Sequence, residues 1–326
     1  MLGAAINPFD QGSITGHEES MSETRRPVTE TSVVKVAGLK ARQVQDNLAT
    51  EEPLEIQLGF GPVGSRQWKS ISVTMRTPGD DFDLAAGFLM TEGVIRDAND
   101  VEQIAYAGDS FTEGTPSPQA MDVLKLGSKQ NTVRVDLAAE VAVNLGSLQR
   151  NFYTTSSCGI CGKASLLALR TVCPPRARNN FRVDAQLLYG LPERLRASQG
   201  VFDRTGGLHG AGLFDSAGTL LALREDVGRH NAVDKLIGSE FLADRTPLRE
   251  RLLLLSGRAS FELLQKALMG GLPMVAAVGA PSSLAVQVAK EFDITLVGFL
   301  RAGHFNIYHG NERIDGYTST SMGVGK

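Results

Sequence analysis

Short apolar runs alternate with helix-like stretches between residues 231 and 299, and this alternation constrains the fold more than any other feature. A chain that alternates strands and helices builds a sheet with parallel neighbours and helical layers on its faces. Just upstream, Leu208–Phe214 and Thr219–Leu223 flank a turn and predict a hairpin. The predicted order after it is a helix from Asn231, a strand at Leu252–Leu255, a helix from Ser260, a strand at Met274–Val278, a helix from Ser283 and a strand at Thr295–Phe299.

The first half of the chain favours strands. In Lys69–Met75, the apolar Ile71, Val73 and Met75 alternate with polar residues, which is the pattern of a strand with one buried face. The other elements predicted here are strands at Val33–Val36, Leu54–Leu58 and Thr132–Leu137, and a helix at Phe82–Leu89 that Asp80 and Asp81 can cap.

Composition divides the chain into three parts. Residues 1–30 mix Gly, Ser, Thr, Glu and Pro without period and lack the segments of a secretory signal, so we expect a disordered tail. Residues 31–150 are predicted to form a smaller, strand-rich N-terminal domain of α+β character. Residues 151–326 are predicted to form an α/β domain.

Charge and cysteine usage exclude several classes of protein. The formal net charge of −3 argues against a general nucleic-acid binder, which is usually basic. The three cysteines are Cys158, Cys161 and Cys173, an odd number that does not suit a secreted disulfide framework. The longest purely aliphatic run, Leu252–Leu255, is too short to span a bilayer. We therefore expect a cytoplasmic globular protein.

The sharpest local motif is a pair of cysteines three positions apart. Cys158 and Cys161 are flanked by glycines and lie where a helix over Gly162–Val172 is predicted to begin. A helix N-terminus stabilises a thiolate, and Lys163 adds a positive charge nearby. The pair is therefore a candidate reactive site.

Other interpretations of the cysteines remain open. The pair could be ordinary buried thiols, because free cysteine is among the most buried residue types. It could also be half of a zinc site, although no second pair exists in the chain. Cys173 ends the predicted helix before two prolines, and we interpret it as a packing residue.

Three strand ends in the last third share a pattern of small residues and arginines. Glycine and serine at such ends expose backbone N–H groups to phosphate, and an arginine fork can hold phosphate oxygens. Because the carboxyl ends of parallel strands form the ligand crevice of an α/β sheet, we expect a phosphate-bearing ligand there. The segments are Ser256–Ser260, which contains Arg258; Gly279–Ser283; and Phe299, Leu300, Arg301, Ala302, Gly303 and His304.

Two histidines and three acidic pairs carry weaker signals. His209 and His230 have glycine neighbours, and the sequence leaves open whether they are functional or structural. The pairs are interpreted as solvated or capping residues rather than as acid–base catalysts; they are Glu51–Glu52, Asp80–Asp81 and Glu225–Asp226.

The motifs together resemble one known family. The segment from Ser156 to Ser165 is similar to the signature of the FdhD family of formate dehydrogenase accessory sulfurtransferases. The resemblance extends from about Thr31 to Ile314 through the segments Met75–Asp81, Gly206–Phe214, Glu225–Lys235, Ser256–Lys266 and Ala280–Ala285.

This resemblance implies a function and a fold. Family members take persulfide sulfur from a cysteine desulfurase and deliver it to the molybdenum cofactor, in its bis-molybdopterin guanine dinucleotide form, which formate dehydrogenase needs. Cys158 corresponds to the persulfide cysteine, with Cys161 as its partner. The cofactor segment falls on Phe299–His304, and we add Arg258. The resemblance further implies a homodimer and a C-terminal cytidine-deaminase-like fold, a three-layer mixed sheet with helices.

Deaminase chemistry itself is not expected. In a deaminase, a Pro-Cys-x-x-Cys pair and a His-x-Glu motif hold zinc. Here Ser157 stands in place of the proline and Ala211 stands two residues after His209, so no zinc is expected. Two alternative functions remain, a thiol–disulfide oxidoreductase and a non-catalytic carrier of the molybdenum cofactor.

Overall fold

The computed structural model describes residues 26–107, 129–143, 166, 169–170, 173 and 180–318. Its helices are α1 (Asp81–Thr91), α5 (Ala185–Ser198), α6 (Gly200–Thr205), α7 (Arg229–Leu242), α8 (Phe261–Met269) and α9 (Ser283–Glu291). Its strands are β1 (Val28–Ala37), β2 (Lys40–Ala49), β3 (Glu52–Phe60), β4 (Gln67–Arg76), β5 (Val101–Tyr106), β6 (Thr132–Leu137), β7 (Val183–Asp184), β8 (His209–Phe214), β9 (Leu220–Asp226), β10 (Leu252–Leu255), β11 (Met274–Ala277), β12 (Thr295–Arg301), β13 (His304–His309) and β14 (Ile314–Asp315). The predicted α/β class is confirmed.

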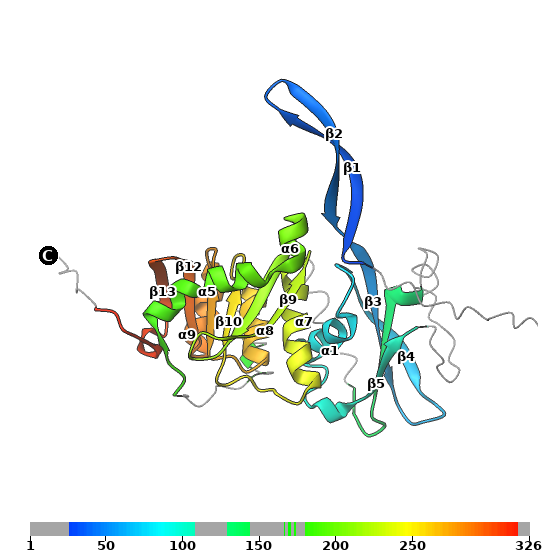
Figure 1. Cartoon of the computed structure of the whole chain (residues 1–326). Coiled ribbons are helices and arrows are strands. Elements are labelled where there is room, and N and C mark those ends of the chain that lie inside the picture. Colours follow the sequence, from blue (N-terminus) through cyan, green and yellow to red (C-terminus); the bar gives the residue numbers. More distant parts are fainter. Residues whose placement is uncertain are drawn as a thin grey trace, which may run out of the picture.

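The C-terminal half is built on a six-stranded sheet in the order β13-β12-β11-β10-β8-β9 (Figure 1). Strands β10, β11 and β12 are parallel, as the alternation of strands and helices predicts. The predicted hairpin is also confirmed, because β8 and β9 pair antiparallel around a turn. Since β8 runs antiparallel to β10, its first residue, His209, lies at the edge where β10 ends.

Helices cover both faces of this sheet. Leu253, Leu255 and Val275 face a core shared with α7, α8 and α9. The alternate residues Leu252 and Leu254 face α5 on the other side. The result is three layers, while the specific likeness to cytidine deaminases stays a prediction. None of the described helices combines the length and the apolar content that crossing a membrane requires.

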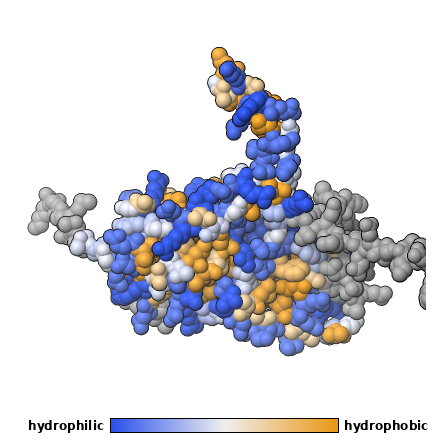
Figure 2. Space-filling model, in the orientation of Figure 1, coloured by the Kyte–Doolittle hydropathy of each residue, from blue (hydrophilic) through white to orange (hydrophobic). Residues whose placement is uncertain are grey.

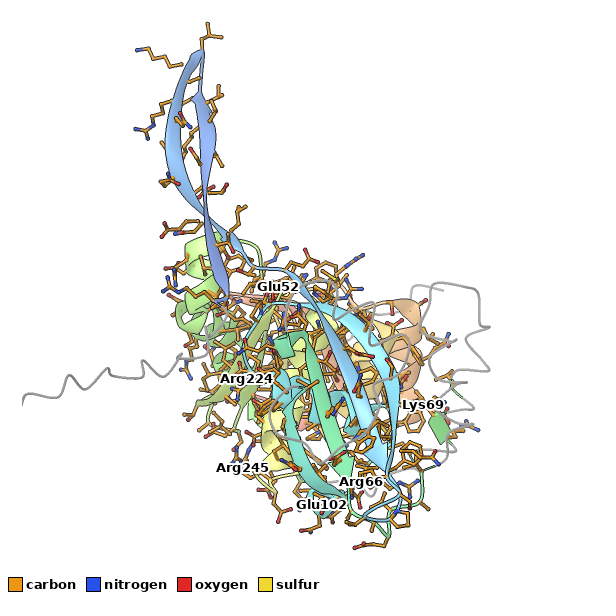
Figure 3. The ribbon with its side chains drawn as sticks, turned by 90° about the vertical axis from the view of Figure 1, so that its right-hand side faces the viewer. Glu52, Arg66, Lys69, Glu102, Arg224 and Arg245 are labelled. Atoms are coloured by element: carbon orange, nitrogen blue, oxygen red, sulfur yellow. The ribbon has the colours of Figure 1, made fainter. Side chains whose placement is uncertain are left out.

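The N-terminal half contains a four-stranded sheet in the order β4-β3-β6-β5, which faces the viewer in Figure 3. The prediction that Ile71, Val73 and Met75 share a buried face is wrong, because only Ile71 is buried. Ile56 pairs with Ser72 and the next residue of β3 pairs with Ser70, so Ile71 is the extra residue of a β-bulge. A bulge interrupts the alternation of side chains, and Val73 and Met75 therefore point to solvent.

The two halves share one core. Helices α1 and α7 cross so closely that a Cβ on Gly87 would lie 1.9 Å from the carbonyl oxygen of Asp234, and one on Gly238 would lie 1.9 Å from that of Asp83. Buried side chains from β3, α1, α7 and α8 belong to a single cluster. The predicted boundary near residue 150 lies outside the described residues.

A hairpin formed by β1 and β2 projects from the body (Figure 1). We call residues Val28–Ala49 the arm. The turn at its tip contains Gly38, whose φ of 60° glycine adopts without strain. The expected tail of residues 1–30 overlaps β1 at residues 28–30, and its first 25 residues lie outside the described part of the chain.

Candidate functional site

The ends of β10, β11 and β12 lie side by side and are joined through their backbones. The amide of Gly279 donates to the carbonyl of Gly257 at 2.9 Å, and the amide of Phe299 donates to the carbonyl of Gly279 at 3.1 Å. A Cβ on Gly279 would lie 3.0 Å from backbone atoms of residues 257 and 258, so a larger residue would force the two strand ends apart. The three predicted strand ends therefore form one continuous edge.

The third strand end differs from the other two. Phe299–His304 is the tip of the β12–β13 hairpin, with Arg301 paired with His304 around a turn at Ala302 and Gly303. Phe299 adopts a φ of 53° at an irregularity in the ladder, a conformation that is uncommon for a residue other than glycine. Strain of this kind concentrates at functional sites.

The hairpin tip offers exposed polar groups. Arg301 through His304 are exposed, whereas Leu300 is fully buried and packs in the core. Directly opposed residues on paired strands present their side chains to the same face, so Arg301 and His304 can act together. Arg258 is also exposed, and neither guanidinium pairs with a carboxylate among the described residues. Both arginines are therefore available to an anion.

A cavity of about 590 Å³ opens beside this edge, between the strand ends and helices α5 and α6. Its walls combine apolar side chains with a few polar groups, which is the usual character of a small-molecule site. The lining includes Leu195, Arg196, Gln199, Phe202, His209, Ser256 and Val278.

Two polar side chains in this cavity stand out. Gln199 is 4% exposed, and its Nε2 has no hydrogen-bond partner in the described part of the chain. A buried donor without a partner is costly, so it is a natural contact for a ligand. Burial lowers the pKa of His209, and the positive charge of Arg229 lowers it further, so the site favours the neutral imidazole. The sequence analysis missed Gln199, because nothing in its neighbours signals a buried amide.

The start of α7 is held at the same edge by a buried carboxylate. Asp226 is fully buried and accepts hydrogen bonds from the amides of Gly228 at 2.8 Å and Thr77 at 3.1 Å. It also forms an ion pair with Lys235 at 2.8 Å. This network fixes the position of His230, which follows in the first turn of α7.

His230 is linked to the start of α8. Its Nε2 lies 3.9 Å from a carboxylate oxygen of Glu262. Mainly through His230, the pKa of the Glu262 carboxyl is lowered to about 2. The helix N-termini of α7 and α8 therefore meet at the candidate site, and both histidines singled out by sequence belong to this edge.

The acidic pairs have mostly structural roles. Glu225 accepts from the amides of Val201 and Phe202 and so caps α6, as predicted. Asp226 is buried rather than solvated. The predicted capping by Asp80 and Asp81 is wrong, because Asp80 makes no side-chain capping bond and Asp81 pairs with the buried Arg76.

One of the three cysteines lies in the described part of the chain. Cys158 and Cys161 lie outside the described residues, as does the predicted start of the helix that follows them. Cys173 is buried in the core shared by both halves, which confirms its interpretation as a packing residue.

The model of the FdhD/NarQ family matches residues 49–315. The chain belongs to this family. Among its relatives is a protein named "Sulfur carrier protein FdhD" from Streptomyces avermitilis, which is 50% identical over 276 residues, covering 82% of this chain and 89% of the relative. A protein of the same name from Mycobacterium tuberculosis is 49% identical over 284 residues, covering 86% of this chain and 97% of the relative.

A solved structure supports the fold of this family member. It is a candidate formate dehydrogenase accessory protein from Desulfotalea psychrophila, with a TM-score of 0.64 and 22% sequence identity. The match covers 89% of this chain and all of the other chain. The family model and the two relatives, rather than this structure, confirm the family resemblance inferred from the sequence motifs.

Proposed function

We propose that this chain is a sulfurtransferase that accepts persulfide sulfur from a cysteine desulfurase on Cys158 and delivers it to bis-molybdopterin guanine dinucleotide for formate dehydrogenase. Cys161 is the partner thiol. The observation that supports this most directly is the edge formed by three strand ends, which carries two exposed arginines and adjoins a cavity, in a chain 50% identical to a protein named as a sulfur carrier.

The first step requires a nucleophilic thiolate. The thiolate of Cys158 attacks the terminal sulfur of the donor persulfide, a new S–S bond forms on Cys158, and the donor cysteine leaves as a thiolate. Lys163 and the predicted helix start favour the ionised form of Cys158. The terminal sulfur then becomes the group that is passed on.

The second step requires a site that holds the acceptor. The guanine nucleotide ends of the molybdenum cofactor carry phosphates, which suit Arg258 and Arg301. Ala302, Gly303 and His304 are exposed at the hairpin tip, while Phe299 and the buried Leu300 would contribute through their backbone. The cavity lined by Gln199 and His209 suits a planar ring of the same ligand.

Mass spectrometry tests the sulfur-transfer proposal. After incubation with a cysteine desulfurase and cysteine, the peptide containing Cys158 is expected to gain the mass of one sulfur atom, and a reductant is expected to remove it. Omission of the desulfurase is the control. Reduction of protein disulfides without added sulfur would instead favour a thiol–disulfide oxidoreductase, and binding of cofactor without added sulfur would favour a passive carrier.

Calorimetry with guanosine diphosphate tests the binding edge. A charge-assisted bidentate contact contributes roughly 1.5–3 kcal/mol, so Arg301→Ala is expected to weaken binding by about 10- to 150-fold. Arg301→Lys is expected to restore only part of the affinity, because an ammonium lacks the planar fork. Arg42→Ala, which removes an exposed arginine on the arm, is the matched control. Equal affinity of the wild type and the three variants for guanosine diphosphate would show that the phosphates bind away from the hairpin tip.

A further inference from the structure

Three polar atoms at the first turns of α7 and α8 are buried without a hydrogen-bond partner in the described part of the chain. They are Nε of Arg229, Nε2 of His230 and Oγ of Ser260. Ser260 is the residue before α8, and its side chain caps no amide of that helix. Leaving a buried polar atom unpaired costs free energy, so three of them at one junction indicate a ligand that supplies the missing partner.

The surroundings of these atoms favour an anion. The carboxylate of Glu262 lies 3.9 Å from Nε2 of His230, and mainly through His230 the pKa of this carboxyl is lowered to about 2. After burial, the positive charge of Arg229 is the next cause that lowers the pKa of His209, so Arg229 lies near the start of β8 at the same edge. Because the Glu262 side chain is half exposed, it can turn to solvent and leave its place to an oxygen of a ligand.

This position is separate from the one proposed for the phosphates. His209 pairs with Asp226, so β9 ends beside the start of β8, and α7 begins three residues later. Neighbouring strands lie about 4.8 Å apart, so the end of β9 is about 10 Å from the end of β10, which precedes Arg258, and about 19 Å from β12, which ends at Arg301. A diphosphate held by those two arginines therefore leaves Arg229 to a second anionic group.

The surface between the two positions suits one continuous ligand. The cavity described above is lined by His209, Ser256 and Val278 from the ends of β8, β10 and β11, so it lies between them. The edge adjoins the base of the arm, where Ala49 lies against Gly207, and there Figure 2 shows mainly hydrophilic residues along the upper rim of the body. A ligand that carries a ring and two separate anionic groups fits this arrangement.

We propose that Arg229, His230 and Ser260 form an oxyanion site distinct from the diphosphate position, and that this site receives the molybdenum–oxo end of the cofactor. The phosphates and the metal-bound oxygens are separate anionic groups of that one molecule, so each position on the edge holds one of them. This inference rests on the proposed function for the identity of its ligand, and it adds where on the edge the metal end lies.

Calorimetry of the full chain with molybdate and with guanosine diphosphate tests this site. Molybdate is the probe because it is an oxyanion of the same metal. The wild type is expected to bind one molybdate per chain, also when guanosine diphosphate is saturating. Arg229→Ala is expected to weaken molybdate binding by about 10- to 150-fold, because a charge-assisted contact is lost, and to change the affinity for guanosine diphosphate by less than about threefold. Arg301→Ala is the matched control and is expected to show the opposite pattern.

Two other variants keep the test independent of the loss of one arginine. Ser260→Ala removes a neutral hydroxyl and is expected to weaken molybdate binding by about 2- to 10-fold. Arg229→Lys is expected to restore only part of the affinity lost in Arg229→Ala, because an ammonium lacks the planar fork. Circular dichroism and thermal unfolding check that each variant stays folded.

Three outcomes overturn the inference. The first is a wild type that binds no molybdate at millimolar concentrations, and the second is a molybdate affinity that Arg229→Ala and Arg301→Ala lower equally. The third is tighter binding of inorganic phosphate than of molybdate through Arg229, which would assign the site to a phosphate group. The mass-spectrometric test of Cys158 uses no oxyanion, so added sulfur without bound molybdate would reject this site and leave sulfur transfer standing.

Discussion

Cys158→Ala is expected to abolish the activation of formate dehydrogenase while leaving the fold intact. Without the thiolate there is no atom on which the donor sulfur can be held, so the loss is expected to be complete rather than partial. Formate oxidation, measured in cells that carry the variant as their only copy, reports the result.

Cys173→Ala is the matched control for this experiment. Cys173 is a cysteine of the same chain that is buried in the core, so its replacement removes packing but no reactive group. Activity close to wild type is expected, with at most a modest loss of stability. Full activity of Cys158→Ala would show that the sulfur is held elsewhere and would contradict the catalytic assignment.

Lys235→Met is expected to cause the largest loss of stability. It leaves Asp226, which is fully buried, without the ammonium that lies 2.8 Å from it. Breaking a buried ion pair by removing one partner typically costs about 3–5 kcal/mol. Urea unfolding of the full chain measures the change in the free energy of unfolding.

Two further variants test whether the loss of stability comes from the unpaired buried charge. Removing both charges, with Asp226→Asn added to Lys235→Met, is expected to recover part of the loss, because no unpaired charge then remains in the core. Arg182→Met breaks an exposed pair with Asp315, in which both side chains are more than half exposed, and is expected to cost less than about 1 kcal/mol. Equal effects of Lys235→Met and Arg182→Met would contradict a structural role for the buried pair.

Elements with a strong apolar pattern could be predicted from the sequence. Leu252–Leu255 and Thr132–Leu137 match β10 and β6 residue for residue. These segments are buried strands whose own residues carry the signal. The sequence also predicted that the three strand ends lie at one edge of the sheet, because parallel strands separated by helices must end at the same edge.

Other features depend on contacts that a local pattern does not contain. The exposure of Val73 and Met75 results from the bulge at Ile71, which depends on how β4 pairs with β3. Phe299–His304 was predicted only as a strand end, and the returning strand β13 was not predicted, although Gly303, with a φ of 72°, is the kind of residue that closes a hairpin. Helix α5 was not predicted, and it contains Pro192, which usually marks an end rather than an interior.

The arm and the cavity were missed for different reasons. Of the arm, only Val33–Val36 was predicted, because the second strand, Lys40–Ala49, is rich in polar residues and no buried face marks it. The cavity beside Gln199 arises where α5, α6 and two strand ends come together. Such a cavity results from the packing of several elements, so no single segment of the sequence indicates it.

For the sulfur transfer proposed above, the shared core limits how far a sulfur held on Cys158 can travel. Leu166 packs against that core and stands eight residues after Cys158 in the chain. A fully extended chain covers at most about 3.6 Å per residue, so the Cys158 sulfur must meet both its donor and its acceptor within about 29 Å of Leu166, plus the length of one side chain. Cys161 is five residues from Leu166, so its backbone lies within about 18 Å of Leu166. An acceptor bound on the same chain would therefore be met at a rate that does not depend on protein concentration, whereas loading from a separate donor would remain a bimolecular encounter.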